Sequence, residues 1–370
     1  MLTAHPDLAI PEESHYMYDW MRLRAKGQGP ADITTDAGWA DVTRFVLDHP
    51  RTRHLGLDPE ELARRCGGSA PRTHATVFSS VLAAAAAREG KPRWGDKTPQ
   101  HVQYLLVLAA LFPEARFVHL VRDGRDTALS LLSLRERGLS KWGPRSMGHA
   151  GYYWAWLVLS GLLAGRLLGP RRYRQLRFED LVTDPVAALR PLCAWAGLPF
   201  HDDVLAYHDN ETTRAYAQAG DPRKRWLTQA PDPARTGRWK IDMAPSDRAS
   251  LLRQAGGLLA HLGYEVESLT SRQQRLAQSL EELQGESLER VDRSAPAHSV
   301  RGLRLTAAMA LDRGRQLAAL RRGALEPFAR ASLRWQRSMA AMLADAETPT
   351  KSPTTSPTTT PTSTPPGARP

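Results

Sequence analysis

The sequence predicts an α/β protein in which short parallel strands alternate with helices over residues 1–268. Three short apolar runs, at 8–10, 115–121 and 173–178, have the length and polar flanks of strands. Helical segments separate them, and connections of that length favour parallel pairing in a doubly wound sheet with helices on its faces.

The helices of this region follow from apolar spacing and from capping residues. They are expected at 14–26, 73–90, 98–112, 126–137 and 183–197. Thr98 before Pro99, and Asp184 before Pro185, are the best start signals, because a side-chain oxygen caps the first N–H groups and proline fits the first turn. We expect 115–121 to be a buried strand between two of these helices.

The chain changes character after residue 268. Residues 269–347 are rich in Arg, Leu and Ala without strands, which predicts a helical extension. It is either a solvated arm, an oligomerisation arm or a basic surface for membranes. Residues 348–370 are almost all Pro, Thr and Ser, and with so little to bury they are expected to be disordered.

Composition narrows the class of protein. The 370 residues are 42% hydrophobic, enough for a sizeable core, and the formal net charge is +11. That charge fits either a solvated basic surface or affinity for anionic ligands such as nucleotides, membranes or nucleic acid. Cys66 and Cys193 show no disulfide framework or metal-ligand spacing. No leader is visible, and the most apolar run, 154–165, is too short to span a bilayer, so we expect a cytoplasmic protein.

The first candidate site is the stretch FVHLVRDGRDTALS at 117–130. Arg122 leaves the strand at its carboxyl end, where open parallel sheets bind ligands, and Ser130 follows inside the next helix on the same face as Thr127. An Arg fork beside a helix start that carries a hydroxyl suits a phosphate group. The alternative pairs Arg122 with an acid and makes Ser130 a small packing residue.

Three further stretches carry candidate chemistry. Lys97, just before the helix at 98, suits a transferring anionic group, although a surface lysine is the commoner explanation. Glu12 and Glu13 lie at a helix start, where carboxylates are stabilised anyway, or one of them is a general base. The basic segment 223–240, with two tryptophans, is either a nucleotide or nucleic-acid contact or an anchored surface loop.

In this order, the motifs resemble those of the sulfotransferases that use 3′-phosphoadenosine 5′-phosphosulfate, especially the bacterial branch and the tyrosylprotein sulfotransferases. The matching stretches are AHPDLAIPEESH, GDKTP, FPEARFVHLVRDGRDTALSLL, LRFEDLVTDPVAALRPLCAWAGLPF and TGRWK, within residues 1–245. The resemblance implies a parallel sheet like that of P-loop NTPases.

The resemblance also implies roles for single residues. Arg122 and Ser130 hold the 3′-phosphate of the co-substrate, and Arg238 belongs to a flap that closes over it. Glu13, rather than Glu12, deprotonates the acceptor. Lys97 neutralises charge on the transferring sulfuryl group.

A sixth residue shows a departure from the family. Phe178 stands where relatives often carry a tyrosine near the adenine, so a hydroxyl contact there is lost.

The implied reaction needs no metal, since it asks mainly for alignment and for stabilisation of spreading negative charge. The acceptor is a small molecule, glycan, lipid or peptide; no nucleic-acid partner is expected, and a homo-oligomer or a membrane-surface contact through the C-terminal helices stays open. The alternatives are a non-catalytic nucleotide-binding relative and a basic interaction protein.

One family element is missing before the first motif. A strand and a phosphosulfate-binding loop directly precede the AHPD motif in the family, so we expect the true start of the gene to lie upstream of Met1.

Overall fold

The computed structural model describes residues 1–25, 28–30, 32–68, 70–140, 143–210, 213–214, 217, 225–282, 328–334 and 336. The predicted disordered tail at 348–370 lies outside these residues, as does most of the predicted helical extension at 269–347.

The strands pair in parallel. Strand β1 (Leu8–Ala9) pairs with β2 (Arg93–Trp94), and β3 (Phe117–Val121) pairs with β4 (Tyr173–Arg177). The α/β class and the parallel pairing are therefore confirmed. Within the described part of the chain, however, the strands form two separate two-stranded sheets instead of one continuous sheet.

Strand β3 differs from its prediction in burial. Val121 is buried, but Val118 and Leu120 are 41% and 48% exposed, so the expectation of a wholly buried strand was wrong. Among the described strands, β3 pairs only with β4. Alternate side chains of β3, those of Val118 and Leu120, are therefore exposed on one face of the strand.

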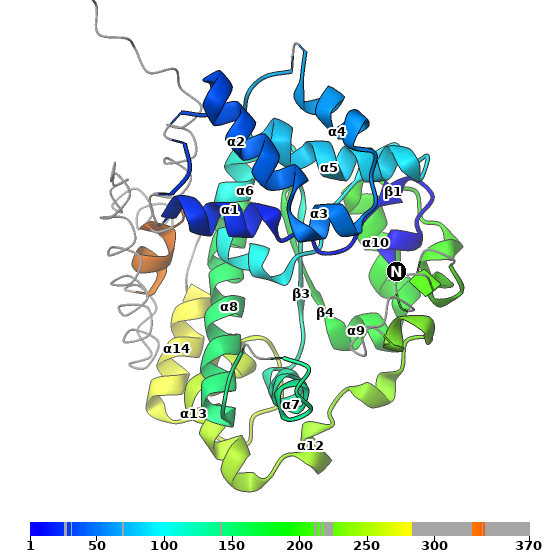
Figure 1. Ribbon diagram of the computed structural model, residues 1–370. Helices are drawn as coiled ribbons and strands as arrows, with labels where there is room; N and C mark the ends of the chain where they lie inside the picture. Colours follow the sequence, from blue (N-terminus) through cyan, green and yellow to red (C-terminus); the bar gives the residue numbers. More distant parts are fainter. Residues whose placement is uncertain are drawn as a thin grey trace, which may run out of the picture.

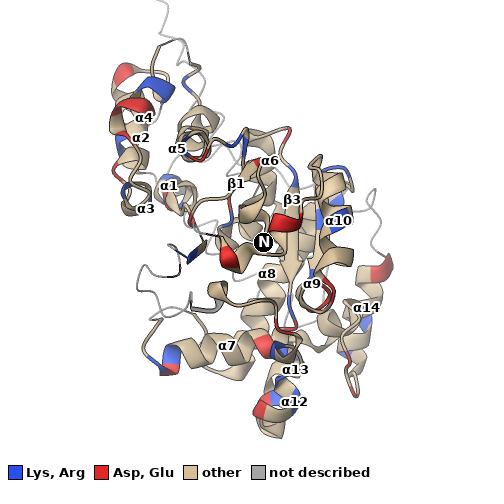
Figure 2. Cartoon of the chain, turned by 90° about the vertical axis from the view of Figure 1, so that its right-hand side faces the viewer, with Lys and Arg blue, Asp and Glu red and all other residues tan. Residues whose placement is uncertain are grey.

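Helices surround the two sheets (Figure 1). Their bounds are α1 Tyr16–Ala25, α2 Asp36–Leu47, α3 Pro50–His54, α4 Pro59–Cys66, α5 His74–Arg88, α6 Leu105–Leu111, α7 Gly124–Glu136, α8 Met147–Leu168, α9 Phe178–Thr183, α10 Pro185–Ala196, α12 Trp239–Asp242, α13 Pro245–His261 and α14 Ser271–Glu282. Basic and acidic residues are interspersed along these helices, as the colours of the cartoon in Figure 2 show. None of the described helices is both long enough and apolar enough to cross a membrane.

Four of the five predicted helices begin close to the predicted residues. Helices α1, α5, α7 and α10 fall within two residues of the predicted bounds at their starts, and Asp184 caps α10 by accepting the Ala187 N–H at 3.0 Å. The segment after Thr98 begins instead as a 3-10 helix, Pro99–Tyr104, and continues as α6. The Thr98 hydroxyl does not cap it, because that oxygen bonds Asp96 and Ser14.

Two apolar clusters hold the fold. One surrounds α8, the long helix through the middle of Figure 1, and takes side chains from α7, α13 and α14. The other lies beneath α1, α2, α4 and α5. Leu276 and Leu280 of α14, together with Phe328, belong to the cluster around α8, so part of the region beyond 268 shares the core of the α/β region.

The turn between β3 and α7 depends on a close approach to α8. A Cβ atom on Gly124 would lie 2.7 Å from the Trp154 ring, so this position requires glycine. The Trp154 indole N–H donates to the Arg122 carbonyl at 3.0 Å. Tight packing against α8 therefore fixes the direction in which Arg122 leaves the strand.

We expect Gly124→Ala to lower the free energy of unfolding by about 1–3 kcal/mol, because the added Cβ would lie 2.7 Å from the buried Trp154 ring, so that either the ring or the start of α7 has to shift. Urea denaturation followed by tryptophan fluorescence measures it. Gly95→Ala is the control, since its Cβ would come no closer than 3.3 Å to its nearest neighbour, Ile10 Cγ1. Equal losses in the two variants would contradict the role given to the Gly124–Trp154 contact.

Candidate active site

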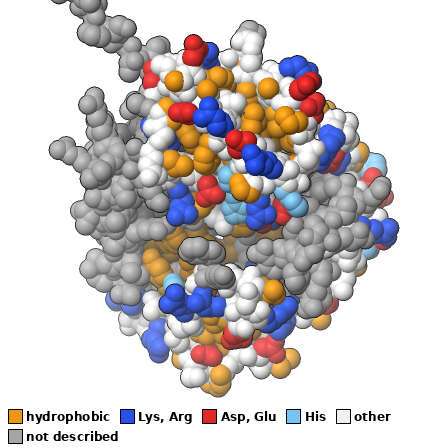
Figure 3. All heavy atoms as spheres, in the orientation of Figure 1, with side chains coloured by type: hydrophobic (Ala, Val, Ile, Leu, Met, Phe, Trp, Pro, Cys, Tyr) orange, Lys and Arg blue, Asp and Glu red, His pale blue; other side chains and the backbone are white. Residues whose placement is uncertain are grey.

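A cavity of about 2190 Å³ lies between the two strand pairs. Residues of β2 and β3 line it, Val118 and Leu120 among them. Hydrophobic side chains are visible in the hollow at the middle of the face drawn in Figure 3. The volume of the cavity exceeds the roughly 300–1,000 Å³ of common small-ligand pockets.

The cavity brings together most of the residues singled out from the sequence. Lys97, Arg122, Ser130 and Phe178 all line it, and so does Glu12. Residues that lie far apart in the sequence thus share one space at the carboxyl ends of β2 and β3.

Glu13 lies at the rim of this group, held by two partners. Lys97 Nζ donates to Glu13 Oε1, and His15 Nε2 lies 3.1 Å from Glu13 Oε2. Burial raises the pKa of the Glu13 carboxyl, but the hydrogen bond with His15 and the charge of Lys97 prevail and lower it to about 2. The carboxylate is therefore ionised throughout the physiological pH range.

The neighbouring Glu12 has different surroundings. It is 7% exposed, with Arg51 Nη1 3.1 Å from Oε1 and His54 Nε2 3.2 Å from Oε2. Both partners come from α3. Glu12 thus ties α3 to the end of β1, whereas the carboxylate of Glu13 is shared with Lys97.

Arg122 keeps part of its hydrogen-bonding capacity. Its Nη2 donates to the Arg235 carbonyl at 2.7 Å and lies 3.9 Å from Asp126 Oδ2, while the buried Nε has no hydrogen-bond partner. The guanidinium carbon lies 4.8 Å from the centre of the Phe178 ring. The guanidinium is therefore desolvated on one face and is not saturated by an acid.

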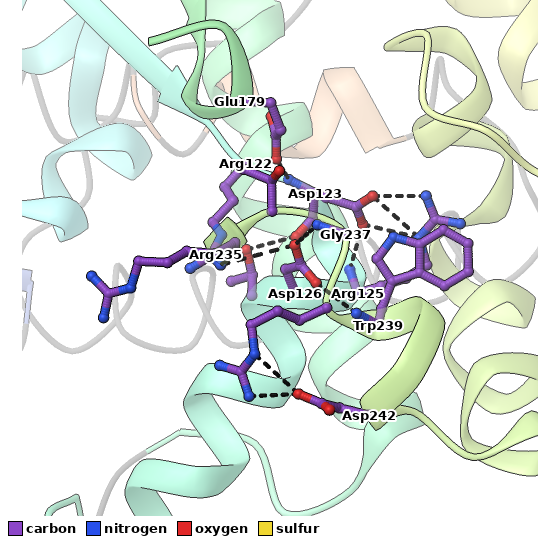
Figure 4. A network of polar contacts seen from close by, with 12 residues as sticks. Arg122, Asp123, Arg125, Asp126, Glu179, Arg235, Gly237, Trp239 and Asp242 are labelled. Atoms are coloured by element: carbon purple, nitrogen blue, oxygen red, sulfur yellow. Dashed lines mark hydrogen bonds and ion pairs between the residues drawn. The ribbon is translucent and has the colours of Figure 1, made fainter. Parts of the chain in front are cut away.

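A buried ion pair supports the start of α7 (Figure 4). Arg125 binds both carboxylate oxygens of Asp123, at 2.7–3.3 Å, and its guanidinium lies over the Trp239 ring at 3.5 Å. The Asp123 N–H in turn donates to Glu179 at 2.9 Å. Helices α7, α9 and α12 are joined at this point.

Asp126 fastens the segment TGRW to the same helix start. Its buried carboxylate accepts the N–H groups of Gly237, at 2.7 Å, and Trp239, at 2.9 Å (Figure 4). Burial raises the pKa of Asp126 above its ordinary value, and the two N–H groups oppose that rise. The backbone of this segment is held beside Arg122 as a result.

Arg238, like Glu13, is a predicted site residue that does not line the cavity. Its side chain is more than half exposed and binds Asp242, with Nη2 2.6 Å and Nε 3.0 Å from Oδ2. The residues that line the cavity do not include it.

Sequence reasoning missed several residues that surround the candidates. His15 and Asp126 lie within quoted motifs but were given no role, and Arg51 lies outside them; the contacts of all three depend on chain segments that meet only after folding. Ser14 was likewise missed, although its hydroxyl donates to Asp96 and its N–H to Thr98 Oγ1 at 3.1 Å. Across the described ranges, no three His, Cys, Asp or Glu residues are grouped so as to hold a metal ion.

Comparisons with known proteins agree on one family. A sequence model of the sulfotransferase family matches residues 1–202. The protein-tyrosine sulfotransferase of Drosophila melanogaster is 22% identical over 270 residues, which are 72% of this chain and 48% of the relative. The omega-hydroxy-beta-dihydromenaquinone-9 sulfotransferase of Mycobacterium bovis is 33% identical over 135 residues, 32% of this chain and 34% of the relative.

Among solved structures, the sulfotransferase domain of the Synechococcus PCC 7002 olefin synthase superposes with a TM-score of 0.46 at 23% identity, covering 72% of this chain and 88% of that one. The chain spans less than half the length of the two curated relatives. Because the family model covers more than half of its residues, the chain belongs to the sulfotransferase family.

Proposed function

We propose that this protein transfers a sulfuryl group from 3′-phosphoadenosine 5′-phosphosulfate to a hydroxyl or amine. The observation that carries the proposal is the convergence of Lys97, Arg122 and Ser130 on one cavity, with Glu13 paired to Lys97 at its rim. Family membership supports it. The α/β unit at 1–268 is the proposed catalytic domain.

The residues present fit such a co-substrate. The buried Nε of Arg122 has no partner, and an unpaired buried donor favours an anion. Ser130 lies in the second turn of α7 and lines the same cavity. In the proposal these two groups hold the 3′-phosphate, and Phe178 provides an apolar ring near the adenine.

Glu13 and Lys97 carry the chemistry. The donor supplies an activated sulfuryl group, whose transfer spreads negative charge over its oxygens by analogy with phosphoryl transfer. The ammonium of Lys97, on a flexible stem, moves from Glu13 to stabilise that charge. Without this partner the Glu13 carboxylate becomes more basic and takes the proton of the acceptor. In this way the move of Lys97 to the sulfuryl group and the basicity of Glu13 are coupled.

Two observations support a proposal for the acceptor class. The names of two relatives give a protein tyrosine and an omega-hydroxy menaquinone derivative as acceptors, both of which offer a hydroxyl. Apolar side chains such as Val118, Leu120 and Val158 line the cavity here. We therefore propose that the acceptor is a hydroxyl group on a hydrophobic small molecule, a lipid or a peptide, and these are the first acceptors to test.

We expect Arg122→Ala to weaken binding of 3′-phosphoadenosine 5′-phosphate about 10- to 100-fold, the effect of losing a charge-assisted hydrogen-bond pair. Isothermal titration calorimetry measures it. Arg122→Lys keeps the charge but loses the two-pronged geometry of the guanidinium, so its affinity should lie between those of the parent and Arg122→Ala. The exposed Arg137→Ala should bind like the parent. Unchanged affinity in Arg122→Ala would remove this residue from the site.

We expect Glu13→Gln to abolish transfer of labelled sulfate while leaving affinity for 3′-phosphoadenosine 5′-phosphate within about threefold, since the base acts on the acceptor. A panel of 4-nitrophenol, N-acetyltyrosinamide, dodecanol and dodecylamine serves as acceptors. If the parent protein binds the nucleotide but transfers sulfate to none of these acceptors, nor to any of an extended panel, the non-catalytic relative is favoured. If Glu13→Gln still transfers sulfate, another residue is the base.

The ionisation of Glu13 also has a consequence for stability. Its pKa in the folded protein, about 2, lies below the ordinary 4.5, so its stabilising contribution is present above pH 4.5 and is lost as the pH falls towards 2. The urea midpoint of Glu13→Gln should therefore lie below that of the parent at pH 7 and approach it at pH 3. For the exposed Glu267→Gln the difference should be small at both pH values; a constant deficit in Glu13→Gln would contradict the linkage.

A further inference from the structure

His15 has an unusual backbone at the edge of the candidate site. Its φ is 50°, and it is the one residue other than glycine with positive φ in the described part of the chain. That conformation costs energy for an L-residue, although His adopts it more readily than most. The His15 carbonyl also accepts the Asp19 N–H at 2.8 Å, so the turn leads directly into α1.

The segment before His15 is fixed on the opposite side. The Ser14 N–H donates to Thr98 Oγ1 at 3.1 Å, and the Ser14 hydroxyl donates to Asp96. Both partners belong to the loop that carries Lys97. The turn at Ser14 and His15 is thus held between α1 and the Lys97 loop, and this support maintains the strained conformation.

The strained turn directs the imidazole of His15 back onto Glu13. His15 Nε2 lies 3.1 Å from Glu13 Oε2, with the imidazole only 19% exposed, while Lys97 occupies Oε1. The other titratable groups around this pair are Asp96 and His101; Asp96 is engaged by Ser14 and Thr98, and His101 is buried with Nδ1 3.9 Å from Asp96.

We propose that His15 is a positioning residue that holds the Glu13 carboxylate ionised and aimed into the cavity when Lys97 leaves it. The catalytic role of His15 rests on the proposed function, whereas the pairing of His15 with Glu13 rests on the structure alone. In the proposed reaction Lys97 moves from Glu13 to the transferring group. His15 is fixed by its backbone, so it stays with Glu13 throughout.

Two substitutions separate the side chain from the backbone. His15→Asn tolerates positive φ but is too short to reach Glu13, whereas His15→Gln places an amide N–H near the position of Nε2. Each is made in the parent and in Lys97→Met, which reproduces the state in which the ammonium has left the carboxylate. Thermal unfolding confirms that each variant is folded before it is compared.

The first readout needs no activity. Carbon-13 NMR of glutamate carboxyl groups follows Glu13, assigned by its loss in Glu13→Gln. In Lys97→Met we expect Glu13 to remain ionised down to pH 4, and in Lys97→Met with His15→Asn we expect its pKa to rise above 4.5, because burial then acts without a partner. His15→Gln in the same background should return the pKa below that of the Asn variant. Identical titration in all three would overturn the pairing.

The second readout concerns catalysis. With Lys97 present, His15→Asn should lower kcat about tenfold with the KM for the donor unchanged, and His15→Gln should recover most of kcat. Equal kcat in the Asn and Gln variants would overturn the positioning role. A parent protein that transfers no sulfate would refute the proposed function instead, and the NMR titration would still decide whether His15 holds Glu13.

Discussion

The buried pair of Arg125 and Asp123 is the interaction on which the candidate site depends. Both side chains are almost wholly buried, and the guanidinium lies between the carboxylate and the face of Trp239. A buried ion pair of this kind often adds little net stability, because desolvation offsets the attraction. Its effect is on geometry: it joins the start of α7 to α12 and so determines where the neighbouring Arg122 can point.

The two halves of the site come from different sheets. Lys97 follows β2 and Arg122 follows β3, and both line one cavity although the two strand pairs share no hydrogen-bonded ladder. Glu13 comes to the rim of the same cavity from the end of β1. The anion-binding group and the base are consequently held by different sheets, and each is supported by its own packing: Trp154 behind Arg122, and Ser14 with Thr98 behind Glu13.

How much of this was visible in the sequence depended on whether the signal was local. Asp184 and the helix at 183–197 were predictable, because a cap and its helix lie within four residues of each other. The strand that ends just before Arg122 was also predictable, because its apolar run and polar flanks are local in the sequence. Strand β2 has only two residues and no apolar run, so it was missed. Thr98 was placed correctly at a helix start, but its hydroxyl serves Ser14, 84 residues away, and no local pattern reports that.

The family motifs indicated residue types without their orientation. Arg238 lies in the expected segment, yet its side chain turns to Asp242 four residues later, while the backbone of that segment is what meets Asp126. The positive φ of His15 had no sequence signature, since histidine is not a residue that marks such a turn by itself.

The contact between Asp126 and the segment at Gly237–Trp239 joins positions more than 110 residues apart. Closing so long a loop is slow and entropically unfavourable until the intervening elements have assembled. During synthesis, α7 therefore leaves the ribosome well before its partner exists, and the guanidinium of Arg122 gains its final surroundings only when the chain has passed residue 239. The surroundings of Arg122 therefore cannot be complete before the segment at residues 235–239 has been synthesised.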